Sequence, residues 1–254
     1  MKKQKAFLLL IISSFLVISK TNSQNLYLNL GAGYAFPAAS EVIDVNHTSV
    51  NDENVYGSFG KGLSFGAGIG YMFSEHIDGE LGLSYLLGST YDVSDDAVLY
   101  SYKGKMFRII PALKITTGDN VKPYAKFGVV FGLAPKVKVE VSGVQGNEVI
   151  SGTEELTGGT SIGWLGAFGV DFHGSSNLSI FVELALIAQS YVPEKFESAI
   201  THSNGNVIIT EVDSRVLVDN RPDGASGQSL APVEPFSSIG INAGIKLTFG
   251  GGSK

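Results

Sequence analysis

The charged residues that could do chemistry in this chain lie within segments of alternating polarity. In these segments every second residue is apolar, and the positions between hold small or polar residues. Glu80, Arg108, Lys114, Lys126 and Glu183 all fall on the polar rows. A lone charge removed from water is costly, so we expect these side chains to pair with one another. They predict either an ion-pair network that fills an interior or a gated polar path through it.

The expected partners follow from placing neighbouring segments side by side. If the segments that hold Glu80 and Lys114 pair symmetrically about their connection, these two side chains lie close together. Arg108 would then reach Glu183, and Lys126 would join them. The same polar rows also carry Asp78, Lys122, Asp171 and Lys246.

One group of residues has the types needed for nucleophilic catalysis. His202 and Ser203 are adjacent, and Glu211 follows downstream. Serine, histidine and an acid co-occur by chance in many polar segments, so a lipid-modifying enzyme is only a remote alternative and we expect no catalytic residues. The other histidines are scattered and the chain has no cysteine, so we expect no metal site and no cofactor.

Eight alternating segments must position these residues. They span residues 25–36, 62–73, 77–91, 105–116, 121–133, 161–173, 178–191 and 236–249. The connections between them are long, short, long, short, long, short and long, which is the asymmetry of a barrel with short turns at one membrane face. Each segment exceeds the ~9–11 residues that a tilted strand needs to cross a bilayer. The pattern predicts an all-β fold, an eight-stranded antiparallel up-and-down transmembrane β-barrel.

Three details refine this prediction. The alternation of residues 121–133 continues through Val141, which predicts a strand that projects beyond the membrane. Pro111 interrupts a strand of a barrel that has no edge, so we expect a bulge there. Residues Asn206–Asp219 have the pattern of a hairpin, and ten wall strands would result if it joined the barrel.

The N-terminus predicts a signal peptide. A basic start, MKKQK, precedes an apolar run from Ala6 to Ile18, and small residues follow near a cleavage site after Ser23. We therefore expect residues 1–23 to be removed and residues 24–254 to form the barrel domain. Cleavage removes four of the 18 basic residues and leaves 14 against 24 acidic residues, a balance that argues against nucleic acid as a partner.

The long connections are acidic. Residues 38–58, 92–102, 134–158 and 192–235 hold 18 of the 24 acidic residues. This charge is typical of a solvated surface. Weak divalent-cation binding, which would bridge the connections to lipopolysaccharide phosphates, and binding of an unidentified extracellular ligand are the alternatives.

Specific sequences support a resemblance. FRIIPALKI, followed by VKPYAKFGVVFG, and the terminal INAGIKLTF resemble the small outer-membrane barrels that include the OmpA membrane domain, OmpX and OmpW. The resemblance implies a bacterial outer-membrane protein with periplasmic termini and extracellular long loops, in contact with membrane lipid and lipopolysaccharide. It also implies that Ile239–Phe249 is the signal read by the barrel assembly machinery, although Gly250–Lys254 trail the final phenylalanine.

These features predict a non-enzymatic protein of the outer membrane. We expect a structural or adhesion-like surface role through the long acidic connections. The alternative is a small passive channel for polar or apolar solutes, because residues that line a barrel lumen tune either stability or selectivity.

Overall fold

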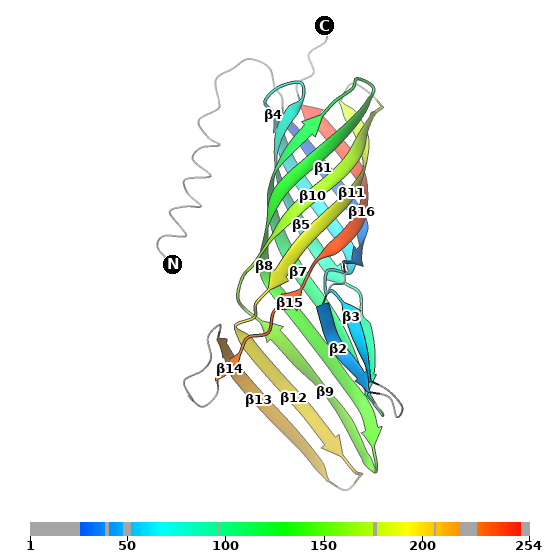
Figure 1. Ribbon diagram of the computed structural model, residues 1–254, viewed down its shortest axis with the longest axis vertical. Coiled ribbons are helices and arrows are strands. Elements are labelled where there is room, and N and C mark those ends of the chain that lie inside the picture. Colours follow the sequence, from blue (N-terminus) through cyan, green and yellow to red (C-terminus); the bar gives the residue numbers. More distant parts are fainter. Residues whose placement is uncertain are drawn as a thin grey trace.

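The computed structural model describes residues 26–38, 41–47, 52–95, 97–174, 177–205, 207–218 and 228–249. Eight antiparallel strands form a closed barrel (Figure 1). They are β1 (Leu26–Pro37), β4 (Gly62–Met72), β5 (Ile77–Gly88), β7 (Val98–Thr116), β8 (Val121–Gln145), β10 (Ser161–His173), β11 (Leu178–Tyr191) and β16 (Ser238–Phe249). Each pairs with the next, and β1 pairs with β16, so the wall has no edge. The fold class predicted from the sequence is confirmed.

The alternation of residue types builds this wall. The apolar rows face outward, and large side chains such as Trp164 and Phe168 are 68% and 67% exposed. The inward-facing positions hold glycine where a large side chain from a neighbouring strand fills the lumen. A Cβ added to Gly70 would lie 2.1 Å from the Tyr27 ring, and one added to Gly169 would lie 2.4 Å from the Tyr124 ring. The described part of the chain contains no helix long and apolar enough to span a membrane.

Both ends of the barrel domain emerge at the same end of the barrel. Leu26 pairs with Phe249, and the three short connections, between β4 and β5, β7 and β8, and β10 and β11, link antiparallel strands at that end. The long connections therefore lie at the opposite end (Figure 1). The predicted signal peptide, residues 1–23, lies outside the described residues.

The long connections form further strands rather than irregular loops. These are β2 (Glu41–His47), β3 (Asp52–Gly57), β6 (Tyr91–Asp95), β9 (Glu148–Thr157), β12 (Lys195–Ser203), β13 (Ile208–Val218), β14 (Gln228–Leu230) and β15 (Glu234–Pro235). Strands β7 and β8 run on beyond the barrel, and a sheet of order β6-β7-β8-β9-β12-β13-β14 forms around them (Figure 1). The predicted projection of the fifth strand is thus confirmed, and we call this seven-stranded assembly the external sheet.

The expectation for Pro111 is wrong, and the number of wall strands, which the sequence left open between eight and ten, is eight. The β-bulge lies between Lys105 and Phe107, whereas Pro111 pairs with Leu81 at an unshifted register. Proline lacks only one donor: the pairing with β8 skips Ile110 and Pro111 and resumes in the same register at Ala112, so no extra residue is inserted. The hairpin in the last connection does not join the wall, because β13 pairs with β12 and β14, and the wall count stays at eight. Its partner strand, β12, begins earlier than Asn206.

Candidate functional site

The lumen near the short-turn end is filled by an ion-pair network. Lys126 Nζ lies 2.8 Å from Glu80 Oε1 and 2.9 Å from Glu183 Oε2. The hydroxyl of Tyr27 donates to Glu80 over 3.1 Å, and that of Tyr124 donates to Glu183 over 3.0 Å. Both carboxylates are thus held by an ammonium group and a phenol, which offsets the cost of burying them.

A second ion-pair group completes this layer. Asp171 Oδ2 accepts hydrogen bonds from Lys114 and Lys246, each over 2.9 Å. Lys114 Nζ also lies 3.7 Å from the centre of the Tyr124 ring, and Lys246 Nζ lies 4.4 Å from that of Tyr27. The two tyrosines therefore join the two ion-pair groups into one layer of buried charge. We call this layer the lower plug.

The expected partners differ from those observed. Lys114 pairs with Asp171 rather than with Glu80, which pairs with Lys126. Arg108 does not reach Glu183: its Nε donates to Gln189 Oε1 over 2.9 Å, and its Nη2 donates to the Phe236 carbonyl over 3.3 Å. Gln189 lies six residues beyond Glu183 on β11, roughly 20 Å along the strand, so Arg108 belongs to another level of the barrel.

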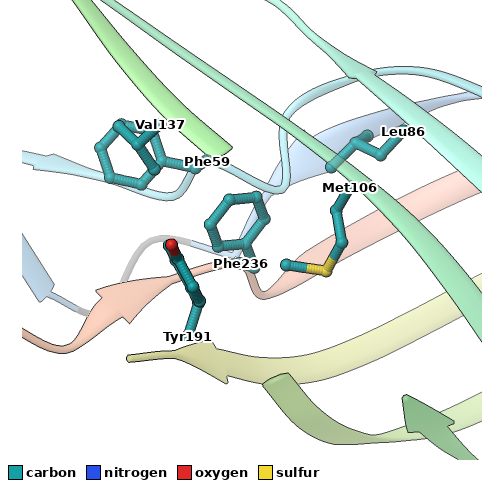
Figure 2. Close-up of a cluster of buried hydrophobic side chains, with 6 residues drawn as sticks. All are labelled: Phe59, Leu86, Met106, Val137, Tyr191 and Phe236. Carbon is teal, nitrogen blue, oxygen red and sulfur yellow. The ribbon is translucent and has the colours of Figure 1, made fainter. Parts of the chain in front are cut away.

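That level is the mouth at the long-connection end. Six buried side chains pack there: Phe59, Leu86, Met106, Val137, Tyr191 and Phe236 (Figure 2). The Phe236 ring lies 5.8 Å from those of Phe59 and Tyr191, measured between centroids. Arg108, which is 2% exposed, hydrogen-bonds to this cluster through the Phe236 carbonyl, and we call the cluster with Arg108 the upper plug.

The upper plug consists in part of connection residues rather than wall residues. Phe59 precedes β4, and Phe236 precedes β16. Their backbones are joined: Phe59 N donates to the Pro235 carbonyl over 2.8 Å, and the Ser58 hydroxyl donates to the Ser237 carbonyl over 2.6 Å. Phe236 N also donates to the Gln189 carbonyl on the wall over 2.9 Å. Two connections thus close the mouth together.

A small cavity lies in the lumen. Its volume is about 130 Å³, enough for several water molecules. It borders the lower plug and extends to Ser84 on β5, which is the pairing partner of Arg108 on the neighbouring strand β7. Among the described residues, the lower plug therefore lies beside this cavity, and the upper plug lies nearer the mouth.

The residues considered for catalysis are not brought together. His202 and Ser203 are neighbours on β12, so their side chains point to opposite faces of the external sheet. His202 Nδ1 lies 3.6 Å from Glu148 Oε2, and Glu211 pairs across the sheet with Ile200. The described residues also contain no group of three or more His, Cys, Asp or Glu side chains able to hold a metal ion.

Several site residues carried a weak signal or none. Asp171 and Lys246 were already placed on the polar rows by the sequence, and Gln189 stands on such a row too, which is the signal that could have added it to the lumen set. Phe59 and Phe236 carry no signal that would place them at the mouth, and only the folded chain brings them together there.

The closed wall with its apolar exterior and polar lumen defines a transmembrane β-barrel. No model of a known protein family matches the chain, and no curated protein sequence does. Among solved structures, neisserial surface protein A is 13% identical with a TM-score of 0.45, over 90% of this chain and 100% of that one. A major outer membrane protein of Thermus thermophilus gives 13% and 0.45, over 88% and 99% of the two chains. OprG of Pseudomonas aeruginosa gives 12% and 0.42, over 90% and 98%.

Proposed function

We propose that this protein is a non-enzymatic component of the bacterial outer membrane that presents the external sheet for interactions at the cell surface. The external sheet carries this proposal: seven strands project from one end of the barrel, far beyond what closing a wall requires. The plugged lumen supports it, because packed side chains fill the lumen near the short-turn end and at the mouth.

The proposed orientation puts both termini in the periplasm and the external sheet outside the cell. Short turns face the periplasm in bacterial barrels, and this barrel's termini share that end. Membrane lipid and lipopolysaccharide would then cover the apolar wall. We also propose that Ile239–Phe249, which forms the closing strand β16, is the segment that the barrel assembly machinery recognises.

Cells that display the full chain, compared with a variant in which residues 195–218 are replaced by a short Gly-Ser turn, test the proposed role. The deletion removes β12 and β13 and leaves all eight wall strands. We expect the variant to reach the membrane at the same level and to lose retention on other cells or surfaces. Equal retention of both would contradict the surface role.

A passive channel is the second candidate function, and the cavity in the lumen favours it. The upper closure depends on two connection side chains, which can move without breaking the wall. Steady openings of the wild-type protein in planar bilayers would favour the channel, and silence would favour the surface role. A separate experiment tests whether the protein modifies lipid. The purified protein is incubated with lipopolysaccharide, and the mass of the lipopolysaccharide is measured; we expect no change.

A further inference from the structure

Strand β13 has an edge that no described residue pairs with over most of its length. One side of β13 pairs with β12 from Ile208 to Val216. On the other side, β14 pairs only with Val216–Val218. Within the described part of the chain, the outer backbone groups of residues 208–215 therefore have no neighbouring strand. Such an edge is a template for the addition of another strand.

Two apolar side chains of this edge are exposed to solvent. Val212 is 77% exposed and Ile208 is 73% exposed, more than any lipid-facing side chain of the described wall. They stand on the same face of the strand, two residues on either side of Thr210. Proteins usually protect an exposed edge with charge or proline, and this stretch has neither on the face that carries Ile208 and Val212.

A second copy of the same strand fits this edge. In an antiparallel pairing centred on Thr210, each Thr210 faces the other, and each Ile208 faces Val212 of the second copy. Glu211 then faces Ile209, so no acid lies opposite an acid. Moving the register by one step toward the C-terminus places Glu211 opposite itself, and another step places it opposite Asp213. Because like charges in direct opposition destabilise a sheet, the register centred on Thr210 is favoured over these two shifts.

The symmetry of this pairing fixes how the two barrels point. Antiparallel strands of one sheet are related by a two-fold axis perpendicular to that sheet. Strand β8 runs from the wall into the external sheet, with a bulge against β7 and a positive φ at Ala134 where it leaves the wall. The sheet extends from one end of the barrel along its long axis (Figure 1). The two-fold axis therefore turns the second barrel to face the opposite way. The two molecules would lie in two apposed membranes.

We propose that the edge of β13 between Ile208 and Val212 mediates homotypic contact between molecules in facing membranes. The inference rests on the proposed surface role and names the partner, a second copy of this chain. Five residues from each strand form a small interface, which is weak for one pair. Many copies in each membrane would make the contact effective through multivalency.

Cysteine cross-linking tests the register directly, because the chain contains no cysteine. A Thr210→Cys variant is reconstituted into two vesicle populations, one of which carries a larger, tagged form of the same chain. We expect a disulfide between the two forms only after the populations are mixed under oxidation. Thr201→Cys is the matched control, since Thr201 lies beside Thr210 on the same face but on β12, one strand away from the edge. Equal cross-linking of both variants, or none for Thr210→Cys, would overturn the proposal.

Vesicle clustering provides the second readout. We expect wild-type vesicles to cluster and Val212→Lys to slow clustering by about tenfold or more, because two lysines enter every contact. Val144→Lys is the control, since Val144 is 53% exposed near the β8–β9 turn and is not on this edge.

The results separate this proposal from the surface role itself. If wild-type vesicles stay dispersed while deletion of residues 195–218 still abolishes retention of cells on other surfaces, the edge takes a different partner and only the homotypic inference fails. If the deletion leaves retention unchanged, the surface role fails as well.

Discussion

At the residue scale, the lower plug depends on shared partners. Lys126 forms ion pairs with two carboxylates, and Asp171 forms ion pairs with two lysines. Removal of one shared member therefore leaves uncompensated buried charge on more than one neighbour. A buried pair broken in this way costs about 3–5 kcal/mol, whereas an exposed pair is worth about 0.2–1 kcal/mol.

Replacing Lys126 by Met should lower the melting temperature of the barrel in detergent. Glu80 and Glu183 would lose their common ammonium partner and keep only the hydrogen bonds from Tyr27 and Tyr124. Lys138→Met is the control, because Lys138 forms an exposed pair with Glu140 at a similar distance, 2.8 Å. Similar melting temperatures for the two variants would show that the lower plug does not stabilise the fold.

Arg108 differs from the lysines of the lower plug in its bonding partners, so its replacement should act differently. No ion pair to an acid is formed by Arg108 among the described side chains, and its hydrogen bonds go to an amide and a carbonyl. Arg108→Ala would leave Gln189 Oε1 and the Phe236 carbonyl without this donor and open a cavity below the mouth. We expect a lower melting temperature in detergent, and an unchanged value would mean that Arg108 does not support the plug.

At the scale of elements, the upper plug joins two connections into one closure. Phe59 and Phe236 pack on each other and belong to no wall strand. A double Phe59→Ala and Phe236→Ala variant should open the mouth, because the remaining wall residues cannot fill the volume of two aromatic rings. We expect a lower melting temperature in detergent and no steady openings in planar bilayers, because the lower plug still fills the lumen near the short-turn end. Phe168→Ala removes a ring from the outer wall and is the control.

The external sheet has its own pH dependence. Burial raises the pKa of Glu154 on β9, although the Ser198 hydroxyl, 3.5 Å away, partly opposes the shift. Because the pKa of Glu154 is higher in the folded state than in the unfolded state, its carboxyl group binds a proton more tightly in the folded sheet. The resulting stability is present below the unfolded pKa and is lost as the pH rises through the folded pKa.

Glu154→Gln should therefore protect the amides of β9 and β12 from hydrogen exchange at pH 7. Near pH 4 the wild type and the variant should exchange at similar rates, since the wild-type carboxyl is then largely protonated. A variant that exchanges faster at pH 7 would contradict this reading of Glu154.

At the scale of the whole molecule, the apolar outer rows require a membrane or detergent. Along the described barrel the outward side chains are mostly apolar and exposed, and the buried charges turn inward. We expect the chain without residues 1–23 to fold only in detergent or lipid and to aggregate without them. A dissolved, folded monomer in plain buffer would contradict the assignment as a transmembrane barrel.

The sequence by itself determined the wall of this protein. Period-two alternation in segments such as Ile239–Phe249 defines strands with one apolar face, and the alternation of short and long connections defines their order around the barrel. It also determined which charges face inward, because the parity of a strand fixes the side on which Glu80 or Arg108 points.

Only the tertiary structure decided which of those charges meet. Strands tilt as they close into a barrel, so residues on distant strands share a level that depends on the shear of the whole wall. This is why Arg108 meets Gln189 rather than Glu183. The upper plug and the external sheet were also decided in three dimensions, because Phe59, Phe236 and the strands beyond the wall are placed by contacts between segments far apart in the chain, which no local period encodes.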